Sequence, residues 1–466
     1  MMLTFDEAVE LYKNFEEERA RLDRLRRYYD AEHDILNKQN RGSKEDAKIV
    51  NNYPGYIATI TTGHFLGRAI EYSGIDENEE LVNILKRNFE PSVNNDLALD
   101  MAIYGVAYEL NYHDEEGEFC FDSIDPRNVI VLTDGKIRER VTDAIVFDEH
   151  PDKDNKIVVT MTVYDDTDQI KYAYKKDEGS DTKPEDMLTE EPKTAHNSPR
   201  CPMIQYKNNK SSKGDFEKVL TEIDGYDLAV STSVDDLTDF TDAFLKIINM
   251  TETDSKDIEE AKKNKVFKVD GDGDVDWMIK TVNDAYAQNV KNRLNTDIHK
   301  FSHVPDMSDE NFANNASGVA IKHKLLALEQ IRQEKEKNFR KGLFKRFQNI
   351  ADYLGKTAGS FDIYDLTMKF SANLPQDMLE MAQIARDTAG TLSQRSRIAF
   401  IPGIDATAEL EQIKLEKEEA VENQMNLVPN LDDEEAEEEL ENSGNEEENE
   451  DEEEKKKTKV ADNNEK

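Results

Sequence analysis

A helical pattern that begins near residue 317 and continues to residue 354 is the feature that most constrains this fold. At 1.5 Å per residue, an unbroken helix of that length would extend about 55 Å, which exceeds the width of a small domain. Its middle, residues 332–338, carries no apolar residue, whereas both ends do. We therefore expect the helix to span an elongated assembly, because a compact monomer has little use for it.

The stretch before this helix predicts two helices that flank a short strand hairpin. The first helix starts at Tyr226, and its apolar face has steps of three, four and seven. That face consists of Val230, Val234, Leu237, Phe244 and Ile248. The opposite, anionic face consists of Asp235, Asp236, Asp239 and Asp242. Strands are expected at residues 266–269 and 275–280, on either side of a turn at 270–274, and the second helix covers residues 282–298.

The first half of the chain predicts an α+β fold with a mostly antiparallel sheet. Thr4 and Glu7 form a capping box, and apolar residues at helical spacing follow as far as Tyr29. Two more helices are expected at residues 78–89 and 93–104. Alternation at 106–112 predicts a half-buried strand. Further strands are expected at residues 118–122, 128–132, 144–149, 157–164 and 170–174.

Several polar segments separate or follow these elements. Residues 175–200 contain three prolines and predict a mobile loop, and residues 208–214 have the composition of a linker. After the long helix we expect a strand at 364–370, a helix after Pro375 and a final helix at 406–423. Past Val428 the chain is low-complexity and acidic, and we expect it to be disordered.

The charge of the chain excludes one class of function. The 466 residues carry a formal charge of −41, of which residues 431–466, with 18 acidic and 5 basic residues, contribute −13, leaving −28 for the rest. A chain with this much negative charge cannot bind DNA or an acidic membrane through its overall electrostatics. DNA could still pass along it without being bound. Five arginines between residues 19 and 27 have acids one turn away, so ion pairing is favoured over a nucleic-acid patch.

The sequence also predicts where the protein works. The two cysteines fit a reducing cytoplasm. The N-terminus lacks the pattern of a signal peptide, and no run has the apolar length of a membrane span. We therefore expect a soluble, intracellular protein without a membrane contact.

No motif in the chain predicts catalysis or a resident cofactor. Gly355, Lys356 and Thr357 resemble the end of a P-loop but lack its first glycine and follow a helix instead of a strand. The alternating aspartates at 270–276 lack the glycine and glutamate of a calcium loop, so a hairpin turn is favoured. His299 and His303 fit a helix end better than a metal site. We expect no enzyme activity, no metal and no cofactor.

Several stretches resemble the portal proteins of long-tailed bacteriophages that infect Gram-positive bacteria. The resemblance covers residues 28 to about 419 and is most specific in residues 301–320, Phe-Ser-His-Val-Pro-Asp-Met-Ser-Asp-Glu-Asn-Phe-Ala-Asn-Asn-Ala-Ser-Gly-Val-Ala. Other matching stretches are residues 29–36, 49–67, 215–227, 275–277, 283–299 and 325–330. The acidic tail and residues 175–200 are not covered.

The resemblance implies a ring, usually of twelve subunits, at one vertex of the phage head, through which double-stranded DNA is packaged and ejected. The implied partners are the terminase packaging motor, the head-completion or connector proteins, the major capsid and scaffold proteins and, transiently and without specificity, DNA. The protein would lie in the virion and, during assembly, in the host cytoplasm. A ring also suits the over-long helix, because each subunit then has a neighbour to pack against.

The same resemblance implies a division of the chain. Residues 1–214 would form an α+β wing, residues 215–254 and 282–302 two stem helices, and residues 255–281 the clip. A tunnel loop (303–318), a long helix with a returning wing strand (319–374) and a helical crown (375–427) would follow. The disordered tail (428–466), which composition predicts, completes the chain.

Site residues follow from this division. The tunnel-loop residues are Val304, Asp306, Met307, Ser308, Asp309, Glu310, Asn311 and Phe312. Partner-binding residues of the clip are Phe267, Asp272, Asp274 and Trp277, although Phe267 and Trp277 could equally pack the hairpin. Asp235, Asp236, Asp239 and Asp242 form the acidic stem face. Acids at the loop would repel phosphate over about 8 Å at physiological salt; without the resemblance they would simply solvate a loop.

Two other classes of function compete with the portal. An acidic assembly chaperone or scaffold would explain the charge and the tail, and deletion of residues 428–466 should then abolish function. A packaging ATPase or nuclease is the third hypothesis, which a nucleotide-hydrolysis assay would decide.

Overall fold

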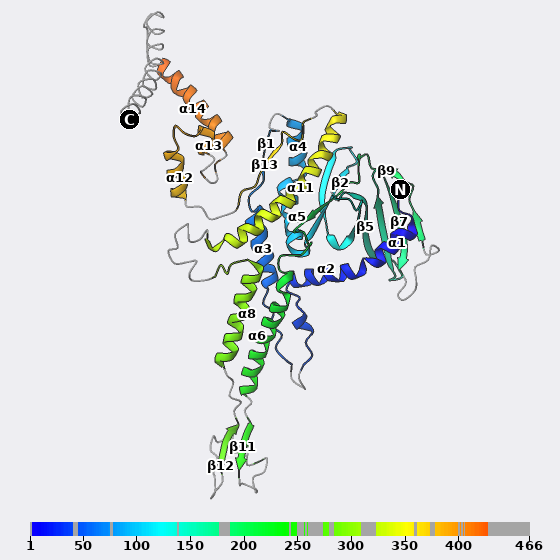
Figure 1. Cartoon of the computed structure of the whole chain (residues 1–466), viewed down its shortest axis with the longest axis vertical. Coiled ribbons are helices and arrows are strands. Elements are labelled where there is room, and N and C mark those ends of the chain that lie inside the picture. The colour runs from blue at the N-terminus through cyan, green and yellow to red at the C-terminus, as the bar shows by residue number, and fades with distance from the viewer. Residues whose placement is uncertain are drawn as a thin grey trace, which may run out of the picture. The chain divides into compact units, whose positions relative to one another are not determined.

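The computed structural model divides into two compact units, Met1–Asn373 and Leu374–Lys466, and each is described by itself. Figure 1 shows the course of the chain. The residues that the structure describes are 2–40, 45–74, 78–137, 139–176, 187–241, 244–248, 256, 259, 274–278, 284–308, 323–357, 361–372, 378–398, 401, 404 and 406–426.

Two helices open the first unit. In α1 (Phe5–Asn14) the predicted capping box is confirmed, since Thr4 Oγ1 accepts from the Glu7 N–H and the Glu7 carboxylate accepts from the Thr4 N–H. The helix buries Ala8, Val9 and Tyr12 against the larger sheet. After α2 (Glu16–Tyr29) and the short η1 (Asp34–Asn37), the chain reaches α3 (Tyr53–Leu66), α4 (Glu79–Arg87) and α5 (Glu90–Tyr104).

The arginines of α2 make ion pairs, as predicted, but mostly not with the acids one turn away. Arg21 pairs locally with Glu18 at 2.5 Å and, across the fold, with Glu217 at 2.6 Å. Arg19 reaches Glu149 at 2.7 Å. These pairs tie α2 to distant elements, so the cluster holds the fold together and leaves no free basic patch.

A three-stranded antiparallel sheet in the order β10-β2-β3 lies against α5 and α11. It consists of β2 (Val106–His113), β3 (Phe119–Ile124) and β10 (Met203–Lys207). The strand predicted at 106–112 is confirmed, but the prediction that it is half-buried is wrong. Ala107, Glu109 and Asn111 on one face are buried as well as Val106 and Tyr108 on the other, because helices cover one face and the second sheet covers the other. Ala107 packs in the main core with helices α3, α5 and α11, whereas Val106 and Tyr108 face the second sheet.

The second sheet is antiparallel, with the strand order β4-β5-β6-β7-β8, and β9 also pairs with β7. Its strands are β4 (Val129–Thr133), which follows η2 (Pro126–Asn128), then β5 (Val141–Pro151), β6 (Ile157–Tyr164), β7 (Asp168–Lys176), β8 (Met187–Glu190) and β9 (Thr194–Ala195). The prediction of one mobile loop over residues 175–200 is therefore wrong for β8 and β9. Their hydrogen bonds to the edge of β7 outweigh a polar, proline-containing composition.

The linker predicted at residues 208–214 is instead an ordered turn. Asn208 is buried, and its side-chain amide donates to the carbonyl of Lys213 at 2.9 Å. Gly214 lies so close to the Ile103 carbonyl that a Cβ would approach its oxygen to 2.2 Å. The segment contains small and polar residues because its backbone packs closely against the fold. The same residue types are common in linkers, which explains the wrong prediction.

The structure corrects the predicted stem helix and hairpin. Helix α6 (Leu220–Thr241), preceded by η4 (Glu217–Val219), ends before Phe244, and Phe244–Ile248 forms strand β11. The strand β12 (Asp274–Met278) is confirmed, but it pairs antiparallel with β11, with Leu245 opposite Trp277. Residues 266–269, the predicted partner, lie outside the described part of the chain. The run 244–248 is apolar and short, and such a run fits a strand as well as a helix turn.

The two long helices next to this ladder pack against each other. Helix α8 (Asp284–Ser302) follows β12 along the chain and lies beside α6 (Figure 1). Gly225 of α6 faces Leu294 of α8, with a hypothetical Cβ 3.8 Å from the leucine methyls.

The long helix is α11 (Leu326–Thr357), with 32 residues. Leu325 is in a turn, so the continuous helix begins later than predicted and extends about 48 Å at 1.5 Å per residue. Its apolar side, Phe339, Leu343, Phe347, Ile350 and Leu354, is buried in the main core with α3 and α5. Part of the polar middle is buried as well, and polar partners compensate for that burial.

A buried ion pair crosses this core. Arg346 of α11 and Glu109 of β2 are both fully buried, and the guanidinium donates to both carboxylate oxygens at 2.6–3.0 Å. Arg346 also donates to Asn94 at 2.8 Å and lies 4.3 Å from the ring of Phe121. A packing of α11 that separated Arg346 from Glu109 would leave a buried charge without a partner, which is costly. The ion pair therefore favours the observed position of α11 on the sheet.

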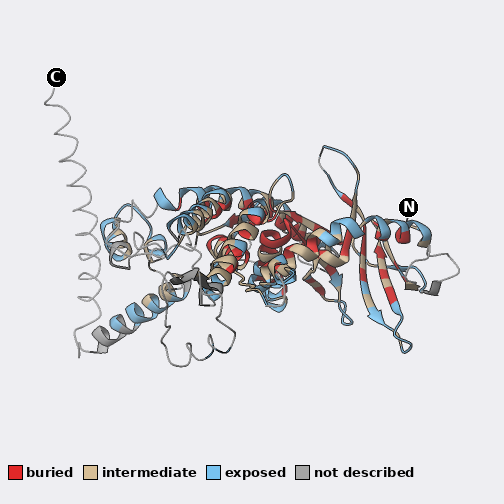
Figure 2. Cartoon of the chain, turned by 90° about the horizontal axis from the view of Figure 1, so that it is seen from below, coloured by how far each residue is buried: buried red, intermediate tan, exposed pale blue. Residues whose placement is uncertain are grey.

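The first unit ends with a two-stranded pairing of β1 (Glu71–Ser73) and β13 (Thr367–Lys369). The strand predicted at residues 364–370 is thus shorter, and its partner was not predicted. The second unit contains α12 (Met378–Asp387), α13 (Gln394–Ile398) and α14 (Ala406–Asn426), which confirms the helix after Pro375 and the final helix. The buried residues, red in Figure 2, all belong to the first unit among those the structure describes.

Candidate functional site

The predicted tunnel loop starts from a closed helix end. Helix α8 ends at Ser302, and His303 adopts a left-handed backbone with φ 63°. The ring of His299 donates from Nδ1 to the Val304 carbonyl at 2.9 Å. His303 Nδ1 donates in the same way to the Lys300 carbonyl at 3.1 Å. Both histidines therefore cap the helix end, as predicted.

Helix α3 holds the first residues of this loop. Tyr56 Oη donates to the Pro305 carbonyl and accepts from the Met307 N–H, each at 2.9 Å. Asp306 accepts from the N–H and the hydroxyl of Ser308, at 2.9 and 2.6 Å. Burial raises the pKa of the Asp306 carboxyl, but the two bonds from Ser308, together with His299 and Asn295, leave the pKa below its usual value. The first residues of the loop, as far as Ser308, are thus anchored to the fold.

This geometry corrects part of the predicted site. Val304 is fully buried and cannot line a channel. Asp306 is bound within the loop base, whereas Met307 and Ser308 are exposed. The other predicted loop residues, Asp309, Glu310, Asn311 and Phe312, lie outside the described residues. Hydrogen bonds at the helix end determine which of the predicted loop residues are held against the fold. The linear sequence pattern does not reveal these bonds.

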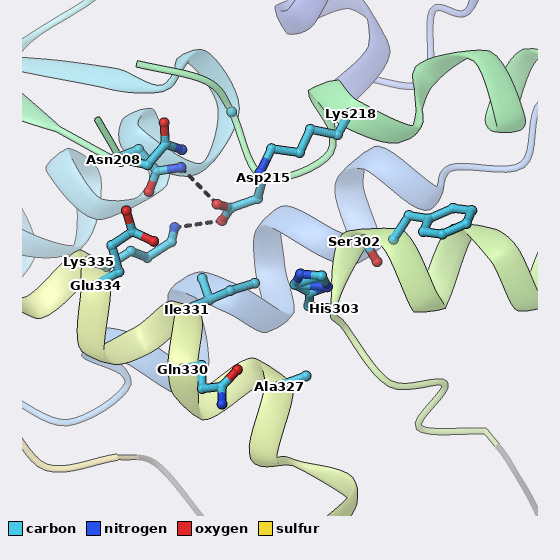
Figure 3. A pocket seen from close by; sticks show the side chains of 13 residues that line it. Asn208, Asp215, Lys218, Ser302, His303, Ala327, Gln330, Ile331, Glu334 and Lys335 are labelled. Atoms are coloured by element: carbon cyan, nitrogen blue, oxygen red, sulfur yellow. Dashed lines mark hydrogen bonds and ion pairs between the residues drawn. The ribbon is translucent and has the colours of Figure 1, made fainter. Parts of the chain in front are cut away.

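A second buried ion pair joins the segment between β10 and η4 to the long helix. Lys335 Nζ of α11 lies 2.5 Å from Asp215 Oδ2, and the two side chains are 1% and 4% exposed. Asp215 also accepts from Asn208 at 2.8 Å and from the Thr61 hydroxyl at 2.6 Å. Figure 3 shows the pair at the edge of a cavity of about 210 Å³, whose walls also include Phe301 and Ser302 of α8 and the following His303.

Sequence reasoning assigned no role to Asp215 or Lys335. One signal was available: residues 332–338 form the apolar-free centre of a helix whose two ends are apolar. A polar segment that cannot face solvent must have a charged partner inside the fold, because an unpaired buried charge is too costly.

The predicted acidic stem face is only partly an open surface. Asp227, Ser231 and Asp235 follow each other at four-residue steps along α6, and each accepts a backbone N–H from the segment 47–51. Ala47 donates to Asp235 at 2.6 Å, Ile49 to Ser231 at 2.9 Å and Asn51 to Asp227 at 2.8 Å.

Two further side chains complete this set of contacts. Lys38 lies 3.1 Å from Asp235, and the ring of His33, which is fully buried, lies 2.5 Å from Asp227. The prediction that Asp235 belongs to a free anionic face is therefore wrong, since it binds the fold. Asp236 is half-buried, the side chain of Asp239 is not described, and Asp242 lies outside the described residues.

The predicted clip residues fall in or near the β11–β12 ladder. Asp274 lies opposite Ile248 and Trp277 opposite Leu245 in the backbone register. Phe267 and Asp272 lie outside the described residues, so their role stays a prediction. In the described ranges, no group of three or more His, Cys, Asp or Glu residues could hold a metal ion. Over the same ranges, no helix is long and apolar enough to span a membrane.

Comparison with known proteins gives a consistent result over most of the chain. The family model described as "Phage portal protein, SPP1 Gp6-like" matches residues 10–423. The portal protein of Bacillus phage SPP1 is 25% identical over 434 residues, which are 88% of this chain and 85% of that protein. The portal protein of Clostridium phage phiCD119 is 24% identical over 422 residues, covering 84% of this chain and 91% of that protein.

Proposed function

Because this chain belongs to the SPP1 Gp6-like family of phage portal proteins and so has a phage portal function, we propose that its copies close a ring around a DNA channel at one capsid vertex. The ring, of twelve copies, would pass double-stranded DNA during packaging and ejection. It would also be the docking platform for the terminase packaging motor and the connector proteins. In this role the protein is structural and carries no catalytic step.

The observation that carries this proposal is the anchored base of the loop after α8. Tyr56 of α3 holds the loop at Pro305 and Met307. The Asp215–Lys335 pair holds α11 beside the cavity that His303 also lines. The described part of the loop, Val304 to Ser308, is thus held at a defined place on the fold. This is what a loop that projects into a channel requires, because a channel of constant width needs every copy to present its loop alike.

The charge of the chain supports a conduit over a binding protein. A chain with a formal charge of −41 does not, overall, neutralise the phosphates of DNA. DNA that contacts it therefore releases few counterions, and its affinity for the protein stays low. Acids at positions 309 and 310 would repel the DNA backbone and keep it away from the wall. A wall rich in lysine and arginine would instead bind phosphates and slow the passage of DNA.

The second unit supports assembly in a different way. None of its described residues is buried, and Leu392, Ile404 and Leu415 are 41%, 41% and 55% exposed. Short helices without a buried face are marginal in water. We assign these helices, with residues 375–427, to the crown, where neighbouring copies would cover them. Residues 1–214 are assigned to the wing, 215–254 and 282–302 to the stem and 255–281 to the clip.

Electron microscopy and native mass spectrometry of the purified chain test the proposal. We expect closed rings, and a chain truncated before residue 428 should form them as well, which the chaperone hypothesis does not require. A stable monomer at micromolar concentration would refute the ring.

Location of the loop needs a separate test. With cysteine at position 309 and both native cysteines replaced, we expect cross-links between neighbouring copies in assembled heads. Absence of such cross-links, together with density for residue 309 on the outer rim, would refute the channel assignment while leaving the ring intact.

A further inference from the structure

A groove of about 1120 Å³ beside α11 differs in charge from the rest of this anionic chain. It lies between α11 and the segment that joins β4 to β5, along the edge strand β10. The basic residues that line it are Lys207, Lys210, Lys337, Arg340, Lys341 and Lys345. Two acids, Glu139 and Glu334, also line it, which leaves a local charge of +4 in a chain of −41.

Most of these cations have no acidic partner. Lys207 pairs with Glu139 at 2.6 Å, and Arg340 pairs with a glutamate of its own helix at 2.7 Å. For the other four lysines, no carboxylate lies within ion-pair distance among the residues that the structure describes. Lys345 is half-buried, and burial and the nearby charge of Lys207 lower its pKa. An anion bound in the groove would relieve this repulsion.

The shape of the groove favours a protein surface over DNA. Val141 and Phe344 contribute apolar area to the walls, and Ile137 is fully exposed at the rim. Apolar area contributes to affinity only when the partner covers it with apolar area of its own. Lysine side chains can cover apolar area with their aliphatic stems while their ammonium groups stay at its edge. A groove lined in this way suits an acidic protein face.

The chain carries a complementary surface at the opposite edge of the same sheet. Asp96 of α5 and Asp122 of β3 are exposed, and Asp100 is half-buried one turn after Asp96. Burial and the charge of Asp122 raise the pKa of Asp96, so these acids repel each other. Among the described residues no cation pairs with Asp96 or Asp122 within 4 Å, although Arg26 and Arg127 act on Asp100 from further away.

The sheet order explains why the two surfaces can meet between copies but not within one. The order is β10-β2-β3, so the lysine groove borders β10 at one edge and the acidic residues border β3 at the other. A ring is built from head-to-tail contacts, in which each copy uses two different faces. Opposite edges of one sheet provide such a pair of faces.

We propose that the lysine groove of one copy receives the Asp96–Asp122 face of the next copy, and that this contact closes the ring. The inference rests on the proposed ring and names the surfaces that form it. The matching charges select the neighbour and its orientation, since like charges brought together across an interface oppose the wrong pairing.

A charge-swap experiment tests the contact. The first variant carries Lys337→Glu and Lys341→Glu, the second carries Asp96→Lys and Asp122→Lys, and the third carries all four changes. Each altered side chain is exposed, and equal circular dichroism spectra and melting temperatures establish that all variants fold. Lys86→Glu with Lys153→Glu is the control, because it changes the net charge as the first variant does, at exposed sites that belong to neither surface.

We expect the first two variants to lose rings, with the fraction of assembled copies falling roughly tenfold or more, because like charges then face each other. The four-fold variant should regain rings, and the control should keep them. Rings in either of the first two variants, or no recovery in the third, would overturn the proposal. Rings together with weaker binding of a short DNA duplex by the first variant would overturn it in favour of a nucleic-acid surface. If the unmodified chain forms no rings, the proposed function itself fails.

Discussion

Replacing Lys335 by methionine leaves the carboxylate of Asp215 buried without its cation. The two side chains are 1% and 4% exposed, so water cannot replace the lost charge partner. Breaking a buried pair from one side costs about 3–5 kcal/mol. Asp215 keeps its hydrogen bonds from Asn208 and Thr61, so we expect the low end of that range, about 3 kcal/mol. Methionine preserves most of the packing of the lysine stem, so the effect reports the charge.

A double-mutant cycle isolates this pair. Asp215→Asn alone leaves Lys335 unpaired and should also destabilise the protein, whereas the two substitutions in one chain leave neither charge at this place. We expect the double variant to recover most of the loss, with a coupling free energy of about 2–3 kcal/mol. The free energy of unfolding is measured from urea denaturation followed by circular dichroism, with the m-value checked for constancy.

The matched control is Lys337→Met, which lies two residues further along the same helix and is exposed. We expect it to change stability by no more than about 0.5 kcal/mol. A cost below about 1 kcal/mol for Lys335→Met, with coupling close to zero, would refute the reasoning, because the pair would then be accessible to water.

Single contacts give three further predictions. Gly342→Ala places a Cβ 2.1 Å from the Tyr206 ring and should lower the melting temperature through a loss of about 1–3 kcal/mol, whereas Gly355→Ala, which has open space, should not. Tyr56→Phe removes both hydrogen bonds of its hydroxyl to the loop base, so hydrogen exchange there should accelerate while the melting temperature changes little. Hydrogen bonds from Arg332 outweigh the effect of burial and lower the pKa of Glu329 from its ordinary value of 4.5 to about 2. This lowered pKa contributes stability above pH 4.5 that is lost as the pH falls towards 2, so the stability difference between the protein and Glu329→Gln should shrink over that window. A difference in unfolding free energy that stays constant over the window would contradict the pairing.

Local patterns were sufficient for the elements whose signal is contained in neighbouring residues. The capping box at Thr4, the alternation in β2 and the strand Ile157–Tyr164 follow from spacing alone, since side chains alternate in a strand and caps act within one turn. Where a short apolar run is compatible with two states, as at Phe244–Ile248, only its pairing with β12 decides that it is a strand.

The same distinction applies to the site residues: some could be predicted from the sequence and others could not. Residues 301–320 pointed most specifically to the portal family and to the loop, because that stretch is long and distinctive. The burial of Val304, the tether to Tyr56 and the binding of Asp235 to Ala47 could not be predicted, because each partner comes from a distant part of the chain.

The order of residues along the chain was enough to establish the class of the protein: an anionic α+β chain with a long helix, no catalytic motif and the resemblance to phage portals. It was not enough to tell which charges hold the fold and which are left for a partner. Lys335 and Lys337 are two residues apart and chemically identical, yet one is buried against Asp215 and the other is exposed in a groove. A charge takes its role from burial and from the groups that surround it, and both depend on segments that meet only in the folded chain.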